Sequence, residues 1–194
     1  MNSVRAEFAP DPGFRTRPFS VAEYHRMLDA GILGEDDHVE LLEGAVVEVS
    51  PQGERHARVI QRLTHAFVRG LGDAFVVRPQ LPLTFRDSEP EPDLAVVRAE
   101  DAASPDEHPS RALLVVEVSR ASLAHDRSVK ARVYARAGVA EFWIVNTVDR
   151  VVEVHRDPDE LGARYRTILA VGEEETLAPA GLPGFSLSVA TLFD

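Results

Sequence analysis

The sequence has no cysteine, so it contains no disulfide, no thiolate zinc site and no cysteine nucleophile. It has no apolar run long enough to span a bilayer, and residues 1–20 lack the apolar core of a signal peptide. We therefore expect a cytoplasmic protein without a membrane segment. With 194 residues, of which 44% are hydrophobic, the chain can bury one sizeable core.

Lysine is almost absent as well. Lys130 is the single lysine, and the other positive charges are twenty arginines. A lysine ammonium is a compact charge that fits beside a reacting oxygen, whereas arginine is a wide planar fork. Lys130 is therefore a candidate for a specific role. The alternative is that an arginine-biased sequence retains one lysine at this place by accident.

The net charge of −11 argues against non-specific binding to nucleic acid. Residues 54–80 and 117–136 differ from the rest, because each window carries +3 and the remainder of the chain carries −17. These windows flank the candidate site described below. Alternatively, the arginines of these windows lie on solvated helix faces, and their aliphatic stems cover the core.

Residues 1–18 are predicted to form a loose arm and residues 19–194 a single domain. Helical spacing and capping residues predict helices at 20–31, 56–69 and 127–137, with Asp126 as the cap of the last one. Residue patterns predict a hairpin at 39–49, a loop at 50–53, strands at 75–78, 81–85, 94–97, 112–118, 142–145, 151–155 and 164–169, and an extended piece at 182–187. Long helices combined with fully apolar strands are typical of an α/β fold with a mixed sheet.

Two acids accompany the most apolar strands. Asp93 opens one of them, and Glu117 lies near the end of the next. A lone buried carboxylate is costly, so each acid needs water, a partner or a metal. Two hard oxygen ligands on neighbouring strands suit Mg²⁺ or Mn²⁺, and with Lys130 they are the equipment of a metal-dependent phosphodiesterase. The alternatives are an arginine ion pair for Glu117 and a strand-entry cap for Asp93.

Further short motifs follow one another along almost the whole chain. They are Glu40–Gly44, Ser50-Pro51, His56, Pro92-Asp93, Glu117–Ser119, Asp126, Lys130, Tyr134, Gly138–Val145 and Leu182–Gly184. Together they resemble the Uma family of restriction endonuclease-like bacterial proteins, formerly a domain of unknown function, within the PD-(D/E)XK nuclease superfamily. The resemblance implies a restriction-endonuclease-like αβββαβ core of a mixed β-sheet flanked by helices, with an N-terminal helix and a β-hairpin as additions.

The resemblance also implies that Asp93 and Glu117 bind the metal and that Lys130 is the catalytic lysine. The general nuclease signature places its lysine two residues after the second acid, where this chain has Ser119, so the lysine is displaced to the next helix. Asn146 stands where the family has an aspartate, and we do not assign it to the site. Nucleases of this kind that cut both strands pair their active sites, which implies a homodimer on DNA.

Four further residues are secondary candidates. Glu40 is either a third metal ligand or an exposed hairpin charge. His56 is either a helix cap or a residue that binds phosphate or orients water. Gln80 either reaches the site or is an edge-strand side chain, and Tyr134 is expected to pack against the stem of Lys130, one helical turn away.

Three functions compete at this stage. The first is a Mg²⁺- or Mn²⁺-dependent endodeoxyribonuclease built on Asp93, Glu117 and Lys130. The second is a nuclease fold that binds or assembles without turnover, which the charge of −11 favours. The third is a hydrolase of small phosphodiesters at the same site. The sequence shows no helix-turn-helix or zinc finger, so no base preference is predicted.

Overall fold

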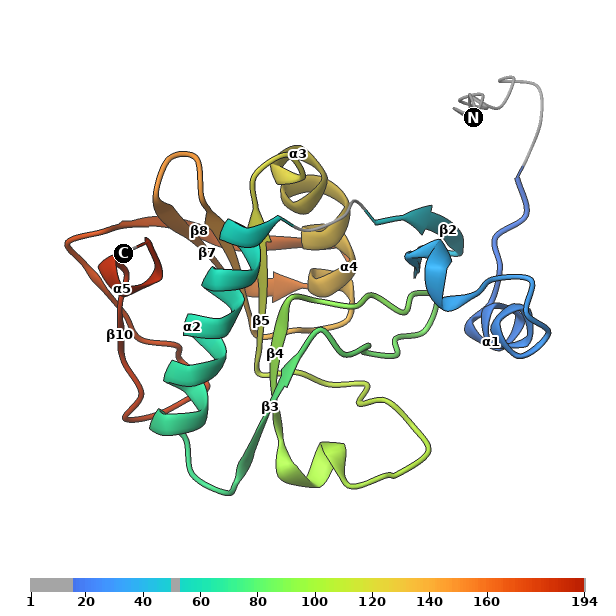
Figure 1. The fold of residues 1–194 in the computed structure, drawn as a ribbon, viewed down its shortest axis with the longest axis horizontal. Helices are drawn as coiled ribbons and strands as arrows, with labels where there is room; N and C mark the ends of the chain where they lie inside the picture. Colours follow the sequence, from blue (N-terminus) through green and yellow to red (C-terminus); the bar gives the residue numbers. More distant parts are fainter. Residues whose placement is uncertain (1–15, 50–52, 194) are drawn as a thin grey trace.

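The computed structural model describes residues 16–49 and 53–193. Its centre is a six-stranded sheet in the order β3-β4-β5-β6-β7-β8 (Figure 1). The strands are β3 Phe75–Pro79, β4 Leu94–Arg98, β5 Leu114–Ser119, β6 Glu141–Asn146, β7 Val151–Asp159 and β8 Arg164–Gly172. β5 and β6 run parallel, and the other four neighbouring pairs are antiparallel. The predicted mixed sheet is confirmed.

Helices cover both faces of this sheet. α2, Glu54–Gly70, buries its apolar face against alternate residues of β4, β5 and β6. On the opposite face lie α3, Leu123–His125, and α4, Ala131–Arg136, which are joined by a π-helical turn at Asp126–Lys130. The order α2-β3-β4-β5-α4-β6 is the expected αβββαβ core.

The N-terminal additions are a helix and a hairpin. α1, Val21–Asp29, begins with the predicted capping box. β1, Val39–Leu42, and β2, Ala45–Glu48, form the antiparallel hairpin after a 3-10 turn at Glu35–Asp37. Figure 1 shows these elements at one side of the molecule.

The hairpin turn needs a glycine. Glu43 and Gly44 have φ values of 51° and 77°, as a two-residue turn between twisted strands requires. A Cβ atom at Gly44 would lie 2.4 Å from Pro18 Cβ. The segment before α1 therefore passes directly over this turn.

The C-terminal segment packs on α2. β9, Thr176–Leu177, and β10, Leu187–Ser188, pair antiparallel, and α5, Ala190–Phe193, follows. The buried side chains of Leu182, Phe185 and Leu192 join the core beneath α2. A 3-10 turn at Ala99–Ala102 follows β4. Among the described residues, no helix combines the length and the apolar character needed to cross a membrane.

Two of the predicted elements are wrong, and two others lie wholly or partly outside the residues that the structure describes. Residues 81–85 form an irregular loop instead of a strand. The predicted helix at 127–137 begins four residues earlier, so Asp126 is not its cap, and Lys130 is the last residue of the π-helical turn. Residues 1–15 of the predicted arm and residues 50–52 of the predicted loop are not among the described residues.

Candidate active site

A cavity of about 660 Å³ opens where β4 begins and β5 ends. Its walls come from the β2 end of the hairpin, the first turn of α2 and the junction between β5 and α3. Figure 1 shows the start of α2 and α3 at the same end of the central strands. Asp93, Glu117 and Lys130 all line this cavity, so the structure brings the three predicted residues together.

Asp93 and Glu117 are neighbours because of strand register. Leu94 pairs with Val116, which places the two acids side by side on adjacent antiparallel strands. Their residues are 5% and 6% exposed. Asp93 Oδ2 accepts a 2.7 Å hydrogen bond from the amide of Val118, and the amide of Asp93 donates a 3.4 Å bond to Glu117 Oε2. The backbone of the sheet thus holds both carboxylates at the edge of the cavity.

Lys130 forms a buried ion-pair triad with two acids. Its Nζ lies 2.6 Å from Glu40 Oε2 and 3.1 Å from Glu117 Oε1. Within the described residues, the ammonium is the sole polar contact of Glu40 Oε2. Burial by itself lowers the pKa of Lys130, but the two carboxylates outweigh it and raise that pKa, so the lysine stays protonated.

Glu117 also receives a hydrogen bond that the sequence did not suggest. Tyr134, which is fully buried, donates its hydroxyl to Glu117 Oε1 at 2.6 Å. Burial raises the pKa of Glu117 to about 8, Lys130 opposes the rise, and Asp93 adds to it. Tyr134, which was expected only to pack against the stem of Lys130, therefore makes a direct polar contact with the acid.

The remaining secondary candidates separate into two cases. His56, on the first turn of α2, donates from Nε2 to Asp93 Oδ1 at 2.8 Å and lines the cavity. Gln80 follows β3 with a φ of 49°, and its exposed side chain is not among the cavity-lining groups. The backbone amide of Gln80 donates a 3.2 Å hydrogen bond to the backbone carbonyl of Asp93, so Gln80 supports the backbone at the site.

Asp126 is a cavity residue that the capping interpretation concealed. Its buried carboxylate accepts hydrogen bonds from the hydroxyls of Ser119 and Ser122, the latter at 2.7 Å. These contacts tie the end of β5 to the π-helical turn that carries Lys130. Such turns are frequent at functional sites, but residue periodicity does not reveal them.

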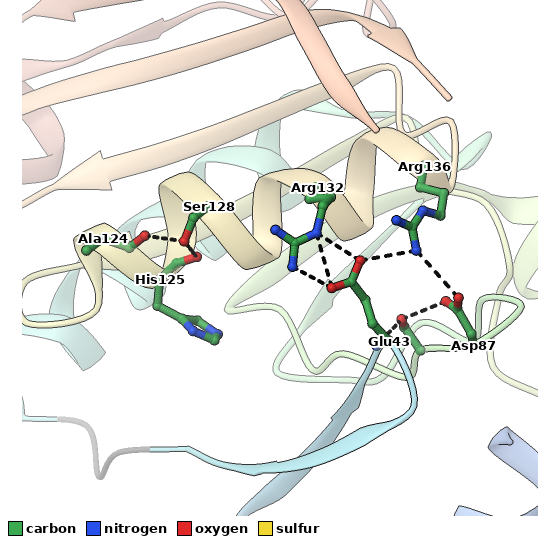
Figure 2. A network of polar contacts seen from close by, with 8 residues as sticks. Glu43, Asp87, Ala124, His125, Ser128, Arg132 and Arg136 are labelled. Carbon is green, nitrogen blue, oxygen red and sulfur yellow. Dashed lines mark hydrogen bonds and ion pairs between the residues drawn. The ribbon is translucent and has the colours of Figure 1, made fainter. Parts of the chain in front are cut away.

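A second network fixes the hairpin beside the site (Figure 2). Glu43, in the hairpin turn, contacts Arg132 Nε at 2.9 Å and Arg136 at 3.1 Å, both from α4. Arg136 also reaches Asp87 at 3.6 Å. The hydrogen bond from Arg132 lowers the pKa of Glu43. These contacts hold the hairpin against α4, which positions Glu40 next to Lys130.

The donor set fits a hard divalent cation with few protein ligands. Four buried acids, Glu40, Asp93, Glu117 and Asp126, line the cavity together with Lys130, whose ammonium contacts two of them. A divalent cation would neutralise this excess of negative charge. The described residues contain no group of three or more His, Cys, Asp or Glu that could hold a metal ion. Mg²⁺ commonly binds through one or two carboxylates and keeps several waters, and the adjacent Asp93 and Glu117 would supply such a pair.

The sequence profile of a family described as "Putative restriction endonuclease", Uma2, matches residues 21–190. The chain belongs to the Uma2 family. Five chains of known structure match this member of the Uma2 family. One is described as a putative nuclease belonging to DUF820 from Anabaena variabilis ATCC 29413. It is 16% identical with a TM-score of 0.67, and the match covers 91% of this chain and 98% of the other. No curated protein matches.

Proposed function

We propose that this Uma2 protein is a divalent-metal-dependent endonuclease that hydrolyses phosphodiester bonds of DNA. The observation that carries the proposal is that Asp93, Glu117 and Lys130 are buried and line one cavity. Membership of a restriction endonuclease family supports DNA as the substrate and hydrolysis as the reaction.

Asp93 and Glu117 are the residues that would hold Mg²⁺ or Mn²⁺. When bound, such an ion polarises the phosphate and acidifies water. Lys130 is protonated and offers its positive charge to the phosphate oxygens, where negative charge develops. His56 holds Asp93, and Tyr134 holds Glu117, so both acids are oriented before substrate arrives.

Glu40 has a different role in this proposal from that of a metal ligand. Its carboxylate contacts Lys130 at 2.6 Å. Glu40 therefore holds the Lys130 ammonium in place, and the ammonium forms ion pairs with both Glu40 and Glu117. For cutting both strands of a duplex, we propose that two copies of the chain act together, which sedimentation on a DNA duplex would test.

The test compares Mn²⁺ binding and DNA cleavage in the wild type, Asp93→Asn and Lys130→Met. We expect Asp93→Asn to lose both cation binding and cleavage. Lys130→Met should lose cleavage by about two orders of magnitude or more, because it removes a preorganised charge in a buried site. Cleavage that survives both substitutions, or Mn²⁺ binding indifferent to Asp93→Asn, would refute the proposal.

A nuclease fold that binds without turnover is the second candidate. The net charge of −11 favours it, because weak association with DNA argues against an enzyme that turns over DNA. It predicts cation-dependent DNA binding in the wild type with no cleavage of any duplex, supercoiled plasmid or chromogenic phosphodiester. Hydrolysis of the chromogenic phosphodiester alone would instead indicate a small-molecule phosphodiesterase.

A further inference from the structure

Two exposed arginines line the cavity beside the acids. Arg55 lies in the first turn of α2, and Arg120 directly follows β5. Within the described parts of the chain, neither guanidinium takes part in an ion pair or a side-chain hydrogen bond. They lie on two different walls of the cavity that the acid pair also lines.

The other seven arginines of the two positively charged windows all make a contact within the protein. Those that contact a side chain or a carbonyl are Arg58, Arg62, Arg69, Arg78, Arg127, Arg132 and Arg136. Four of these seven, Arg58, Arg127, Arg132 and Arg136, pair with carboxylates, whereas the other three contact a carbonyl oxygen or a histidine. Arg55 and Arg120 are the two arginines of these windows without such a contact among the described residues, and both line the cavity of the candidate active site.

The lining of the cavity is acidic as a whole. Seven acidic side chains line the cavity with three cations, Arg55, Arg120 and Lys130, so its charge is −4 with every acid ionised and −3 with Glu117 protonated, both lining histidines being neutral. Lys130 is already paired with two of these carboxylates. A phosphate entering the cavity therefore meets net repulsion unless a divalent cation first neutralises the acids.

We propose that Arg55 and Arg120 bind the DNA phosphates that flank the phosphodiester placed over Asp93 and Glu117, and that this binding requires a prior cation. The inference rests on the proposed function and names the residues that would hold its substrate. A guanidinium suits this task because it binds phosphate oxygens with two parallel hydrogen bonds. Contacts to the phosphates carry no base information, in agreement with the absence of a base-reading motif from the sequence.

The experiment measures the affinity of the full chain for a fluorescent DNA duplex by anisotropy, over a series of KCl concentrations, in Ca²⁺ and in EDTA. The test variant is Arg55→Ala/Arg120→Ala. The matched control is Arg98→Ala/Arg111→Ala, which removes the same charge from two exposed arginines at the opposite ends of β4 and β5. Mn²⁺ binding by calorimetry is measured on both variants.

In Ca²⁺ we expect the test variant to bind DNA at least about tenfold more weakly than the wild type. The slope of log affinity against log salt should fall by about 1.8, because each of the two phosphates that is no longer neutralised accounts for about 0.9. The control should keep most of the affinity and slope. Mn²⁺ binding should be unchanged in both, which distinguishes weaker DNA binding from collapse of the site.

Equal decreases in the two double variants would overturn the inference, because they would show a general charge effect. Unchanged DNA binding in the test variant, or no DNA binding by the wild type in Ca²⁺, would also overturn it. Wild-type binding as strong in EDTA as in Ca²⁺ would refute the cation requirement. A different result would refute the proposed function alone: DNA binding that depends on the two arginines, without cleavage of the DNA. Cleavage that is indifferent to both arginines would retain the function and refute their role.

Discussion

Removal of the Lys130 ammonium tests the buried ion-pair triad most directly. Lys130→Met keeps an unbranched side chain of similar length, so the apolar packing of the stem is largely preserved. What it removes is the positive charge that lies 2.6 Å from Glu40 and 3.1 Å from Glu117. The three side chains are 4 to 8% exposed, so water solvates the two acids poorly once the ammonium is gone.

The expected loss of stability depends on pH. The folded pKa of Glu117 is about 8, above its ordinary value of 4.5, so folding takes up a proton between these values and stability falls as pH rises through that window. Without Lys130, which lowers this pKa, the acid retains its proton to still higher pH. Breaking a buried pair costs about 3–5 kcal/mol, and we therefore expect a loss of about 4 kcal/mol at about pH 9 and about half of that at about pH 6.

The assay is urea denaturation with EDTA present, at both pH values, in the wild type and in Lys130→Met. Arg58→Met is the control, because Arg58 and Glu54 are 59% and 85% exposed and lie 3.7 Å apart. An exposed pair of this kind should contribute less than about 0.5 kcal/mol. A loss below about 1 kcal/mol in Lys130→Met, or an equal loss at both pH values, would refute the reasoning.

Two further substitutions test the groups that support the triad. Tyr134→Phe removes the hydroxyl 2.6 Å from Glu117 and should lower the free energy of unfolding by about 2 kcal/mol in urea denaturation. Unaltered stability would show that the hydroxyl does not stabilise the acid. Glu43→Gln weakens the half-exposed contact with Arg132 and should lower the free energy of unfolding by about 1 kcal/mol. Amide hydrogen exchange should accelerate more in residues 39–48 than in β5. Because Arg132 lowers the pKa of Glu43, the cost should disappear as pH falls through that lowered pKa, and a cost that persists in acid would contradict the assignment.

The mixed sheet and most of its elements could be predicted because apolar periodicity reports burial directly. The error at residues 81–85 shows the limit of this signal. Leu81, Leu83 and Phe85 alternate as in a strand, yet Leu83 donates its amide to Pro90 and Phe85 donates to Ser88. These partners lie in a tight local loop, where alternation of apolar residues does not indicate a strand.

The acid pair could be predicted for a related reason. Asp93 and Glu117 are charged residues next to buried strands, and the pairing of those strands places them together. The capping prediction for Asp126 is wrong because a helix cap and a buried hydrogen-bond acceptor use the same residue type. Its partner Ser119 is seven residues away in the sequence but lies at the end of β5, so only the three-dimensional structure reveals the contact.

The position of Lys130 on a helix has a structural consequence for the hairpin. Residues 117 and 119 point to the same face of β5, where the general nuclease signature would place its lysine. Here the ammonium arrives on that face from the helix, as Lys130, and Ser119 instead anchors the helix through Asp126. An ammonium on a helix can contact an element outside the sheet, and Glu40 of the hairpin supplies that contact. The hairpin is thereby part of the site, and its attachment through Glu43 and α4 couples the position of Lys130 to an addition outside the αβββαβ core.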